Sequence, residues 1–442
     1  MSHVLVAEPI DRAPDAVRLF AAIERQHPDV FWLEGAAPGG TGWSVIGIGA
    51  RRAAIDDLRA VPLAQAPVPG AATVSDPWPA GPFRGGWVGW FAYEDGAART
   101  GAPVHTESAA GASAFVEAGC WVSIRHADGA AWAVAAPDTV GEWADEVARM
   151  LAAEPARPPA PAAPRAAVSR HAPDEYAALI GRCRDAIRRG DAYQLCLTTR
   201  FEVETGERPT DVYRRLRGGS PAPHGGFVRI GDVSLLSASP EEFVTVRSGI
   251  VRTRPIKGTR PRAADPAADA ALAEELLASE KERAENVMIV DLMRNDLARL
   301  CEIGTVRVDA LLAIESYPHV HQLVSTVSGH LRRGAVLGDL VDRAFPAGSM
   351  TGAPKLSAMG ILHALEGAPR GVYAGCFGWV GADGTVELAM VIRTIVMSAG
   401  RAVVGAGGGI TWSSVAAEEV REVGVKARAP LAVLGATLPP GW

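Results

Sequence analysis

The chain has 442 residues, of which 48% are hydrophobic and 21% charged, as in globular proteins of one or two domains. Its net charge of −6 excludes a general attraction to nucleic acid or anionic membranes. The first residues form no secretory leader and no apolar run reaches the ~18 residues of a membrane span, so we expect a cytoplasmic protein. Its five scattered cysteines predict buried thiols rather than disulfides or a zinc site.

Residues 1–152 are predicted to form an N-terminal domain of mixed α/β structure. Apolar residues at helical spacing predict a helix over 15–26, and short apolar runs predict strands over 30–33 and 43–48. Residues 82–94 alternate glycines with aromatic residues, which is typical of strands that pack closely against another backbone.

A segment rich in proline and alanine, 153–169, predicts a semi-rigid linker to a second domain over 170–442. In this second domain an amphipathic pattern predicts a helix over 174–189, and Gly190 suits the position just past its end. Alternating residues then predict a strand over 194–204.

Two further helices are indicated by their starts. Asp265 followed by proline is typical of a helix start, and Ser279 is typical of the start of a longer helix that reaches about Leu300. The longer helix is otherwise apolar, so we expect one or more of its polar residues to be buried and partnered: Glu285, Asn286, Asp291 and Asn295.

The last third of the chain alternates strands with loops that could bind anions. Strands are predicted over 320–327 and over 390–396, the second containing Arg393. Residues 345–355 form a loop that runs onto a helix N-terminus, where anions can bind. Arg393 and the amides of Gly407, Gly408 and Gly409 could together hold a carboxylate.

Residues 254–262 place Lys257 among three arginines and between two prolines. Because like charges disfavour ionisation, this setting predicts a lowered pKa for Lys257 and a neutral amine, which is a nucleophile. Glu241, in a predicted turn between strands, would supply a carboxylic acid at the reacting end. A solvated basic loop is the alternative interpretation of the same segment.

Three carboxylates could form a second centre. Glu419 and Glu422 share a helix face with Lys426, and Glu285 lies on another helix. If these helices converge, the carboxylates could hold a hard cation such as Mg²⁺. The alternative is a salt-bridged surface helix, which the E-x-x-E-x-x-x-K pattern also predicts.

Taken in order, these motifs resemble the family of chorismate-utilising enzymes, which includes anthranilate synthase component I, aminodeoxychorismate synthase component I, isochorismate synthases and salicylate synthases. The resemblance covers about residues 170–440 and, more loosely, the N-terminal part. It implies an α+β fold of large antiparallel sheets facing each other as a sandwich, with helices outside and the site in a cleft. It is carried by Gly190 to Gln194, Ser239-Pro240-Glu241, Pro255 to Arg260, Ala284 to Asn286, Asp291 to Asp296, Gly348 to Lys355, Ile392 to Thr394 and Gly407 to Gly409.

Two positions indicate the branch of the family. Gln194 stands where water-adding members have lysine, and Lys257 stands where anthranilate synthases usually have alanine, which is the mark of aminodeoxychorismate synthases. The resemblance implies that Lys257 attacks C2 of chorismate, that the C4 hydroxyl leaves with a proton from Glu241, and that ammonia then expels the lysine. Anthranilate or 2-amino-2-deoxyisochorismate synthesis is an alternative, and a non-catalytic binding subunit is an alternative of another class.

The resemblance also implies the remaining site residues. Mg²⁺ is expected on Glu285 and Glu422, with Glu419 direct or through water. Residues expected to bind the substrate are Arg393, Thr259, Gly407, Gly408, Gly409, Lys426, Gln322, Gln194 and Thr351.

Two departures from the family pattern stand out. Gln322 replaces a common histidine, and we expect it to point at the substrate and donate a hydrogen bond, because an amide cannot carry a proton. Leu33-Glu34-Gly35 replaces the L-E-S of a tryptophan pocket, which leaves tryptophan binding open. No cysteine lies in a glycine-rich nucleophile turn, so we expect ammonia to come from a separate glutamine amidotransferase subunit.

Overall fold

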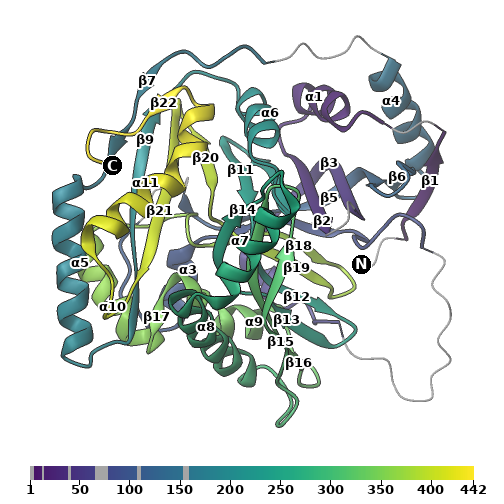
Figure 1. Ribbon diagram of the computed structural model, residues 1–442. Coiled ribbons are helices and arrows are strands. Elements are labelled where there is room, and N and C mark those ends of the chain that lie inside the picture. Colours follow the sequence, from purple (N-terminus) through teal and green to yellow (C-terminus); the bar gives the residue numbers. More distant parts are fainter. Residues whose placement is uncertain (1–3, 12–13, 38–40, 65–77, 107–110, 153–158) are drawn as a thin grey trace.

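The computed structural model describes residues 4–11, 14–37, 41–64, 78–106, 111–152 and 159–442, and the chain folds around a very large β-sheet (Figure 1). Within these residues the sheet joins the following strands: β1 (Val6–Ile10), β2 (Val30–Ala37), β3 (Thr41–Ala53), β4 (Gly86–Phe91), β5 (Ala114–Arg125), β6 (Ala131–Ala135), β8 (Val168–Ser169), β9 (Gln194–Glu204), β10 (His224–Ile230), β11 (Val233–Ser239), β12 (Glu242–Arg247), β13 (Ile250–Thr253), β14 (Ile256–Pro261), β15 (Arg307–Ser316), β16 (Val320–His330), β17 (Gly352–Ala353), β18 (Cys376–Gly381), β19 (Val386–Met390), β20 (Thr394–Ser398) and β21 (Arg401–Ile410).

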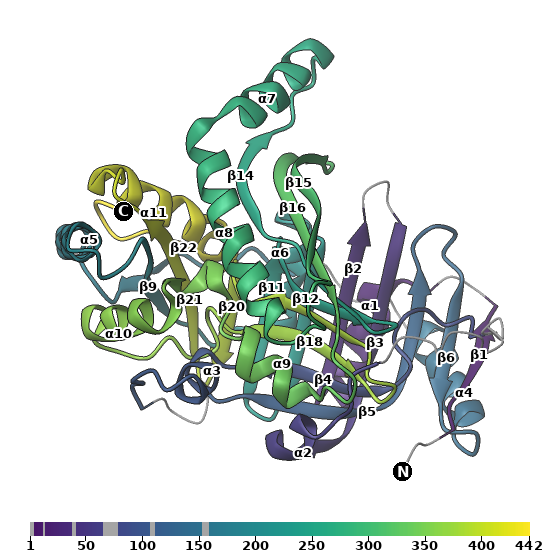
Figure 2. The same ribbon diagram turned by 90° about the horizontal axis from the view of Figure 1, so that it is seen from below.

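Helices cover the outside of this sheet: α1 (Ala16–Gln26), α2 (Ile55–Arg59), α3 (Tyr93–Arg99), α4 (Val140–Ala152), α5 (Pro173–Arg188), α6 (Pro209–Gly219), α7 (Pro266–Ala278), α8 (Glu280–Ala298), α9 (Leu337–Ala344), α10 (Lys355–Glu366) and α11 (Ala416–Val433). Helices α5, α10 and α11 lie outside β9 and β21, on the left of Figure 1. Figure 2 shows α7 and the β15–β16 hairpin extending away from the body. No helix of the described residues is both long and apolar enough to cross a bilayer.

The sheet divides at β5, which pairs with both β3 and β4. The first limb continues from β3 through β2, β10, β11, β20, β21 and β9. The second limb continues from β4 through β18, β19, β12, β13 and β16, with β14 and β15 beside β16. All strand pairs in this sheet are antiparallel, so the expected α+β fold of antiparallel sheets with helices outside is confirmed.

The helix starts follow the local signals. Asp15 caps α1 by accepting from the Val17 and Arg18 amides, and Asp265 and Ser279 cap α7 and α8 in the same way. Helix α5 ends as predicted, with Gly190 just beyond it at φ +83°. Each of these outcomes depends on a few neighbouring residues, which is why the sequence predicts them well.

The close packing predicted for the glycine- and aromatic-rich stretch is also present. A Cβ on Gly89, in β4, would lie 2.0 Å from the Ala114 carbonyl oxygen of β5. Only glycine therefore allows the two strands to approach this closely. The five cysteines are free thiols, four of them buried and Cys120 partly exposed.

Strands and core residues from both sides of the predicted linker pack together. One buried cluster combines Trp32 and Ile46 with Tyr176 and Leu195, and β2 pairs with β10. The division into two domains stays a prediction, and residues 153–158 of the predicted linker lie outside the described residues.

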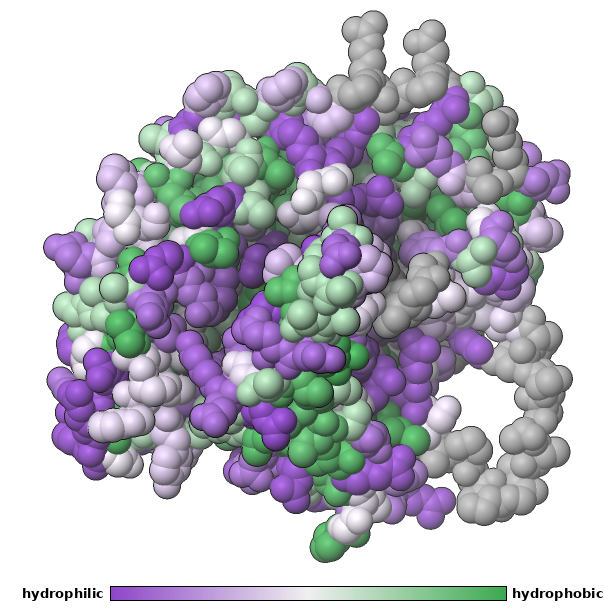
Figure 3. Space-filling model, viewed as in Figure 1, coloured by the Kyte–Doolittle hydropathy of each residue, from purple (hydrophilic) through white to green (hydrophobic). Residues whose placement is uncertain are grey.

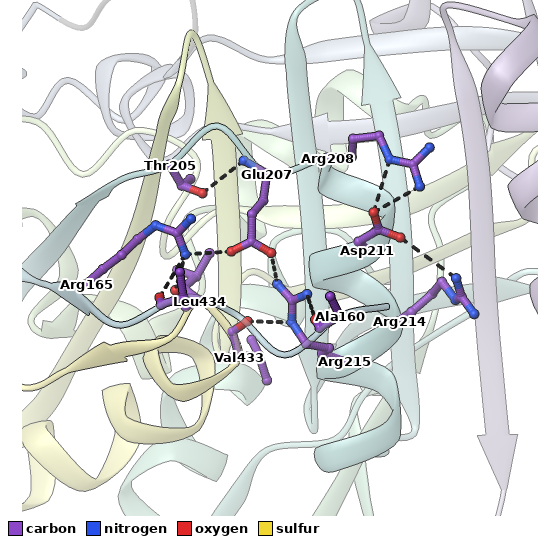
Figure 4. A network of polar contacts seen from close by, with 11 residues as sticks. Ala160, Arg165, Thr205, Glu207, Arg208, Asp211, Arg214, Arg215, Val433 and Leu434 are labelled. Carbon is purple, nitrogen blue, oxygen red and sulfur yellow. Dashed lines mark hydrogen bonds and ion pairs between the residues drawn. The ribbon is translucent and has the colours of Figure 1, made fainter. Parts of the chain in front are cut away.

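The second half of the predicted linker is held by an ion pair of Arg165 and by a hydrogen bond from Arg215 of α6 to the Ala160 carbonyl (Figure 4). Arg165 donates to Glu207 at 2.6 Å and to the Leu434 carbonyl at 3.0 Å. Arg215 contacts the same glutamate and donates to the Val433 carbonyl at 2.8 Å. This segment therefore fastens the end of α11, whose earlier turns carry three predicted site residues.

Candidate active site

The chain passes between the two limbs of the sheet at several places, and two of these crossings carry predicted site residues. Glu241 lies between β11 and β12, and Arg393 lies between β19 and β20. Lys257, in β14, lies beside the second limb, while Gly407 to Gly409 lie in β21 of the first. Residues remote in sequence, from both limbs, are thus brought close together.

Lys257 is aimed by a bulge in its strand. The register of β14 against β16 shifts between Ile256 and Thr259, and Gly258 there has φ +83°. A bulge turns a side chain out of the regular alternation, and glycine tolerates the left-handed conformation that this turn needs. The Lys257 Nζ lies 3.5 Å from the Glu285 carboxylate. A Cβ on Gly409 would lie 3.6 Å from the same Nζ atom.

The expected lowering of the Lys257 pKa is wrong. Burial, the largest effect, does lower this pKa, but Glu285, Cys196, Glu241 and further Glu422 together raise it above its ordinary value. The arginines that should repel the lysine are neutralised: Arg254 pairs with Glu315, Arg260 with Glu275 at 2.9 Å, and Arg262 with Asp269 at 2.7 Å. Their partners come from other elements, which spacing along β14 does not reveal.

Glu241 is a buried carboxylic acid whose pKa lies near 7. Burial raises the pKa of its carboxyl group to about 7, although Lys257, a hydrogen bond from Ser349 and Lys426 act in the opposite direction. The Ser349 hydroxyl donates to Glu241 Oε1 at 3.3 Å. A group with this pKa can both hold and release a proton near pH 7, which is what a general acid needs.

Helix α11 follows the pattern predicted for a salt-bridged face, but it also reaches the site. Lys426 pairs with Glu422 at 2.7 Å, and its Nζ also donates to the Gly407 carbonyl of β21 at 2.9 Å. Glu419 is buried and accepts from Ser414 at 2.8 Å, and a Cβ on Gly408 would lie 3.1 Å from its carboxylate. The same residues thus form both the ion pair and a wall of the site.

The carboxylates of α8 and α11 repel one another, which suits a cation. Burial and then Glu285 raise the pKa of Glu282, and burial together with Glu422 raises that of Glu419. Carboxylate oxygens are the ligands that Mg²⁺ prefers. In the part of the chain that the structure describes, however, no three potential ligands are already grouped for a metal. Glu285 and Glu422 would have to exchange their lysine partners for the ion.

Of the three glycine amides predicted to hold an anion, those of Gly407 and Gly409 have no partner in the neighbouring strands that the structure describes, whereas Gly408 lies at a position that pairs with β9. Opposite them in β9, Thr198 and Cys196 direct their N–H groups away from β21, toward Glu366 and the Thr351 carbonyl. In an antiparallel pair, two residues directly opposite each other either both bond across the pair or both turn their N–H groups away from it. The Gly407 and Gly409 amides, opposite Thr198 and Cys196, therefore point away from β9. Pairing of β21 with β20 ends at Val404, which leaves these amides available to an anion.

Gln194 borders the same glycines. Its side chain is only 1% exposed, and a Cβ on Gly409 would lie 2.5 Å from its Nε2. The Gln194 Oε1 has no partner among the described residues. A buried unpaired acceptor is costly and suits a ligand that donates a hydrogen bond.

Arg393 does not lie in a strand as predicted. Strand β19 ends at Met390 and β20 begins at Thr394, and Arg393 stands between them with φ +52°. Burial lowers the pKa of Arg393, and Tyr373 is the first of the groups that oppose this effect. The crossing between limbs imposes the bend, which explains why a strand pattern misled the prediction.

Tyr373 is a site residue that the sequence reasoning missed. A Cβ on Gly405 would lie 2.1 Å from its ring, so the ring lies flat against β21 next to Arg393. Its hydroxyl could bind a substrate carboxylate beside the arginine. Nothing in its own segment distinguishes this tyrosine from an ordinary core residue.

Gln322 is buried, with 5% exposure, and its Oε1 has no partner among the described residues. It lies opposite Thr259 on β14, whose side chain is exposed. The neighbouring His321 bonds Asp269 at 3.0 Å and Ser316 at 2.8 Å and so is engaged elsewhere, as strand alternation predicts. That Gln322 donates to a substrate stays a prediction.

Thr351 is fully buried, and its hydroxyl donates to the Ala347 and Gly348 carbonyls, so it shapes the loop from within. Asn286 is the buried polar residue expected in α8. It donates to the Leu323 carbonyl at 3.2 Å and accepts from Ser325 at 2.5 Å.

A pocket of about 270 Å³ beside Glu34 is lined mostly by residues between 213 and 238, and an ion pair of Glu34 forms part of its wall. Glu34 accepts from Arg217 at 2.9 Å and lies near Tyr213. A Cβ on Gly35 would face Glu387, so the space left by the missing serine adjoins a carboxylate.

Comparison with known proteins agrees with this arrangement. A family model described as chorismate binding enzyme matches residues 30–432. The chain belongs to this family. A crystal structure of anthranilate synthase component I from Streptococcus pneumoniae matches with a TM-score of 0.72 at 28% identity, covering 97% of this chain and 92% of that one. The menaquinone-specific isochorismate synthase of Escherichia coli, at 18% identity and a TM-score of 0.71, covers 98% and 94% and shares the fold.

Curated members of the family carry two names. An aminodeoxychorismate synthase of Streptomyces pristinaespiralis is 40% identical over 367 residues, covering 80% of this chain and 51% of that one. One of Streptomyces griseus is 47% identical over 271 residues, covering 61% and 38%. Anthranilate synthase component 1 of Streptomyces coelicolor is 41% identical over 387 residues, covering 83% and 74%. The chain thus spans about half or less of the aminodeoxychorismate synthases it matches.

Proposed function

We propose that this member of the family is an aminodeoxychorismate synthase component I, which converts chorismate and ammonia to 4-amino-4-deoxychorismate. The position of the Lys257 amine carries the proposal. It lies inside the site between the Glu285 carboxylate and the Gly409 backbone, close enough to Glu241 for the two charges to interact. A lysine in this place can form a covalent bond to the substrate ring, which splits one difficult displacement into two steps.

The proposed reaction has two displacements. The neutral Lys257 amine attacks C2 of chorismate, the ring double bonds shift, and the C4 hydroxyl leaves as water after taking a proton from Glu241. Ammonia then attacks C4, the double bonds shift back, and the lysine leaves C2. Hydroxide is a poor leaving group, so the protonated Glu241, with its pKa of about 7, supports the first displacement.

The anionic substrate is held by groups on both limbs of the sheet. Arg393 with Tyr373, and the outward amides of Gly407 and Gly409, suit its two carboxylates. Glu285 and Glu422 would hold Mg²⁺, which would neutralise a substrate carboxylate and offset the charge that now raises the pKa of Lys257. Lys257 must lose its proton before it can attack, so the balance between the nearby carboxylates and Mg²⁺ would set the fraction of neutral amine.

The second candidate is ortho amination, which gives anthranilate or 2-amino-2-deoxyisochorismate. The similarity to anthranilate synthase component 1 of Streptomyces coelicolor, over 83% of this chain, favours it. A binding subunit without activity is the remaining possibility. Incubation with chorismate, Mg²⁺ and an ammonium salt separates the three by product: para-amino, ortho-amino or none. An ortho-amino product would overturn the proposal.

The covalent step has its own test. Without ammonia, wild-type protein incubated with chorismate should gain the mass of the substrate less one water, and Lys257→Ala should not. Lys281→Ala, at an exposed lysine of the neighbouring α8, is the matched control and should keep the adduct. An adduct that persists in Lys257→Ala would exclude this lysine as the nucleophile.

We also propose that ammonia comes from a separate glutamine amidotransferase subunit. Exposed apolar side chains next to site elements support a docking surface: Tyr193 (71% exposed) precedes β9, Leu356 lies in the first turn of α10, and Trp412 (66% exposed) follows β21. Figure 3, viewed as Figure 1, shows hydrophilic residues between α11 and α8. Exposed apolar patches bordered by polar residues often mark protein interfaces.

A further inference from the structure

A buried ion pair lies directly behind the site. Glu366, the last residue of α10, and Arg370 are 5% and 6% exposed. Their side chains meet through two hydrogen bonds, Arg370 Nε to Oε2 at 2.8 Å and Arg370 Nη2 to Oε1 at 2.7 Å. The ring of Tyr93 lies 4.3 Å from the guanidinium carbon. Burying two charges costs free energy unless further hydrogen bonds satisfy both groups, and this pair makes several such bonds to the backbone.

Those bonds tie together two segments that line the site. Arg370 Nη1 donates to the Met350 carbonyl at 2.7 Å, and Nη2 donates to the Cys196 carbonyl of β9 at 2.8 Å. Glu366 accepts from the Thr198 amide at 2.9 Å and from its hydroxyl at 3.0 Å. The pair therefore holds the loop after α9 and strand β9 in a fixed relation.

The held loop places the partner of the proposed acid. Ser349, directly before Met350 and only 9% exposed, donates its hydroxyl to Glu241 at 3.3 Å. Lys257 and Lys426 are the charged groups that act on the same carboxyl group. A planar guanidinium can bind two carbonyls and a carboxylate at once, whereas the ammonium of a lysine is a single point of charge.

We propose that Arg370 is a positioning residue for proton transfer: through the Met350 carbonyl it holds Ser349 against Glu241. The inference rests on the proposed function, because the role of Glu241 as the acid belongs to it. Among the described residues Arg370 has no hydrogen bond to Glu241, and the proposed path to that carboxyl group runs through Met350 and Ser349.

The experiment compares Arg370→Lys, Ser349→Ala and the double variant. The rate of chorismate amination, divided by the concentration of free NH₃, should fall at high pH as Glu241 loses its proton. The midpoint of this fall is the pH at which the normalised rate is halved. Loss of the Ser349 hydrogen bond favours the protonated form of Glu241, so Ser349→Ala should raise the midpoint by about half to one pH unit. Arg370→Lys should move it in the same direction, and the double variant should move it no further than Ser349→Ala alone.

A second readout does not depend on catalysis. Titration of the Glu241 carboxyl carbon by NMR, in protein labelled at glutamate and assigned with Glu241→Gln, should show the same shifts without chorismate. If wild type fails to aminate chorismate, the proposed function fails, and this titration still decides the role of Arg370.

Arg229→Lys is the matched control. Arg229 also pairs with a glutamate, Glu24, and donates to the Pro28 and His27 carbonyls, but at β10, away from the site. It should lower the melting temperature and leave the midpoint in place. An unchanged midpoint in Arg370→Lys, or a double variant whose shift equals the sum of the single shifts, would show that Arg370 is only structural.

Discussion

Glu241 should make the protein less stable as the pH rises, and Glu241→Gln should remove this effect. Burial raises the pKa of its carboxyl group from 4.5 to about 7 in the folded protein. The folded state therefore binds this proton more tightly than the unfolded state. The resulting stabilisation is complete below about pH 4.5 and is lost as the pH rises through about 7. A shift of this size corresponds to at most about 3 kcal/mol.

The assay is urea unfolding of wild type and Glu241→Gln between pH 5 and pH 8.5, with the free energy of unfolding extrapolated to water. As the pH rises, the free energy of unfolding of wild type should fall by about 2–3 kcal/mol relative to that of Glu241→Gln. Glu418→Gln, at an exposed position of α11, controls for the loss of one charge and should show no such trend. A flat difference between the proteins over this range would refute the reasoning about the buried acid. The variant should also slow amination by about 10²–10⁴-fold, as loss of a general acid does.

Three further outcomes are expected. Glu422→Gln should raise severalfold the Mg²⁺ concentration needed for half-maximal activity, whereas an unchanged requirement would leave Glu422 only as the ion-pair partner of Lys426. Gln322→Ala should lose about tenfold in activity and Gln322→His should keep most of it, because a donor remains; equal losses would contradict a hydrogen bond to the substrate. The chain alone should use ammonium salts, faster as free NH₃ increases, and should fail with glutamine until an amidotransferase is added; glutamine use by the chain alone would contradict a separate subunit.

The sequence by itself determined the elements whose causes are local. Asp15, Asp265 and Ser279 start helices because each side chain caps amides two or three residues away. Strand β9 has the predicted bounds because its alternating residues suit a pleated strand. The order of the motifs also predicted the family and its antiparallel fold.

Only the tertiary structure decided the chemistry of the site. The charge state of Lys257 depends on Glu285 of α8 and on carboxylates that take up the neighbouring arginines, all from other elements. Arg393 is bent because the chain crosses between limbs there, which a pattern of apolar residues cannot show. Tyr373 and Arg370 gain their roles from contacts with β21 and with the Ser349 loop. Electrostatic and hydrogen-bond effects act through space over a few ångströms, and sequence spacing does not report which distant residues come that close.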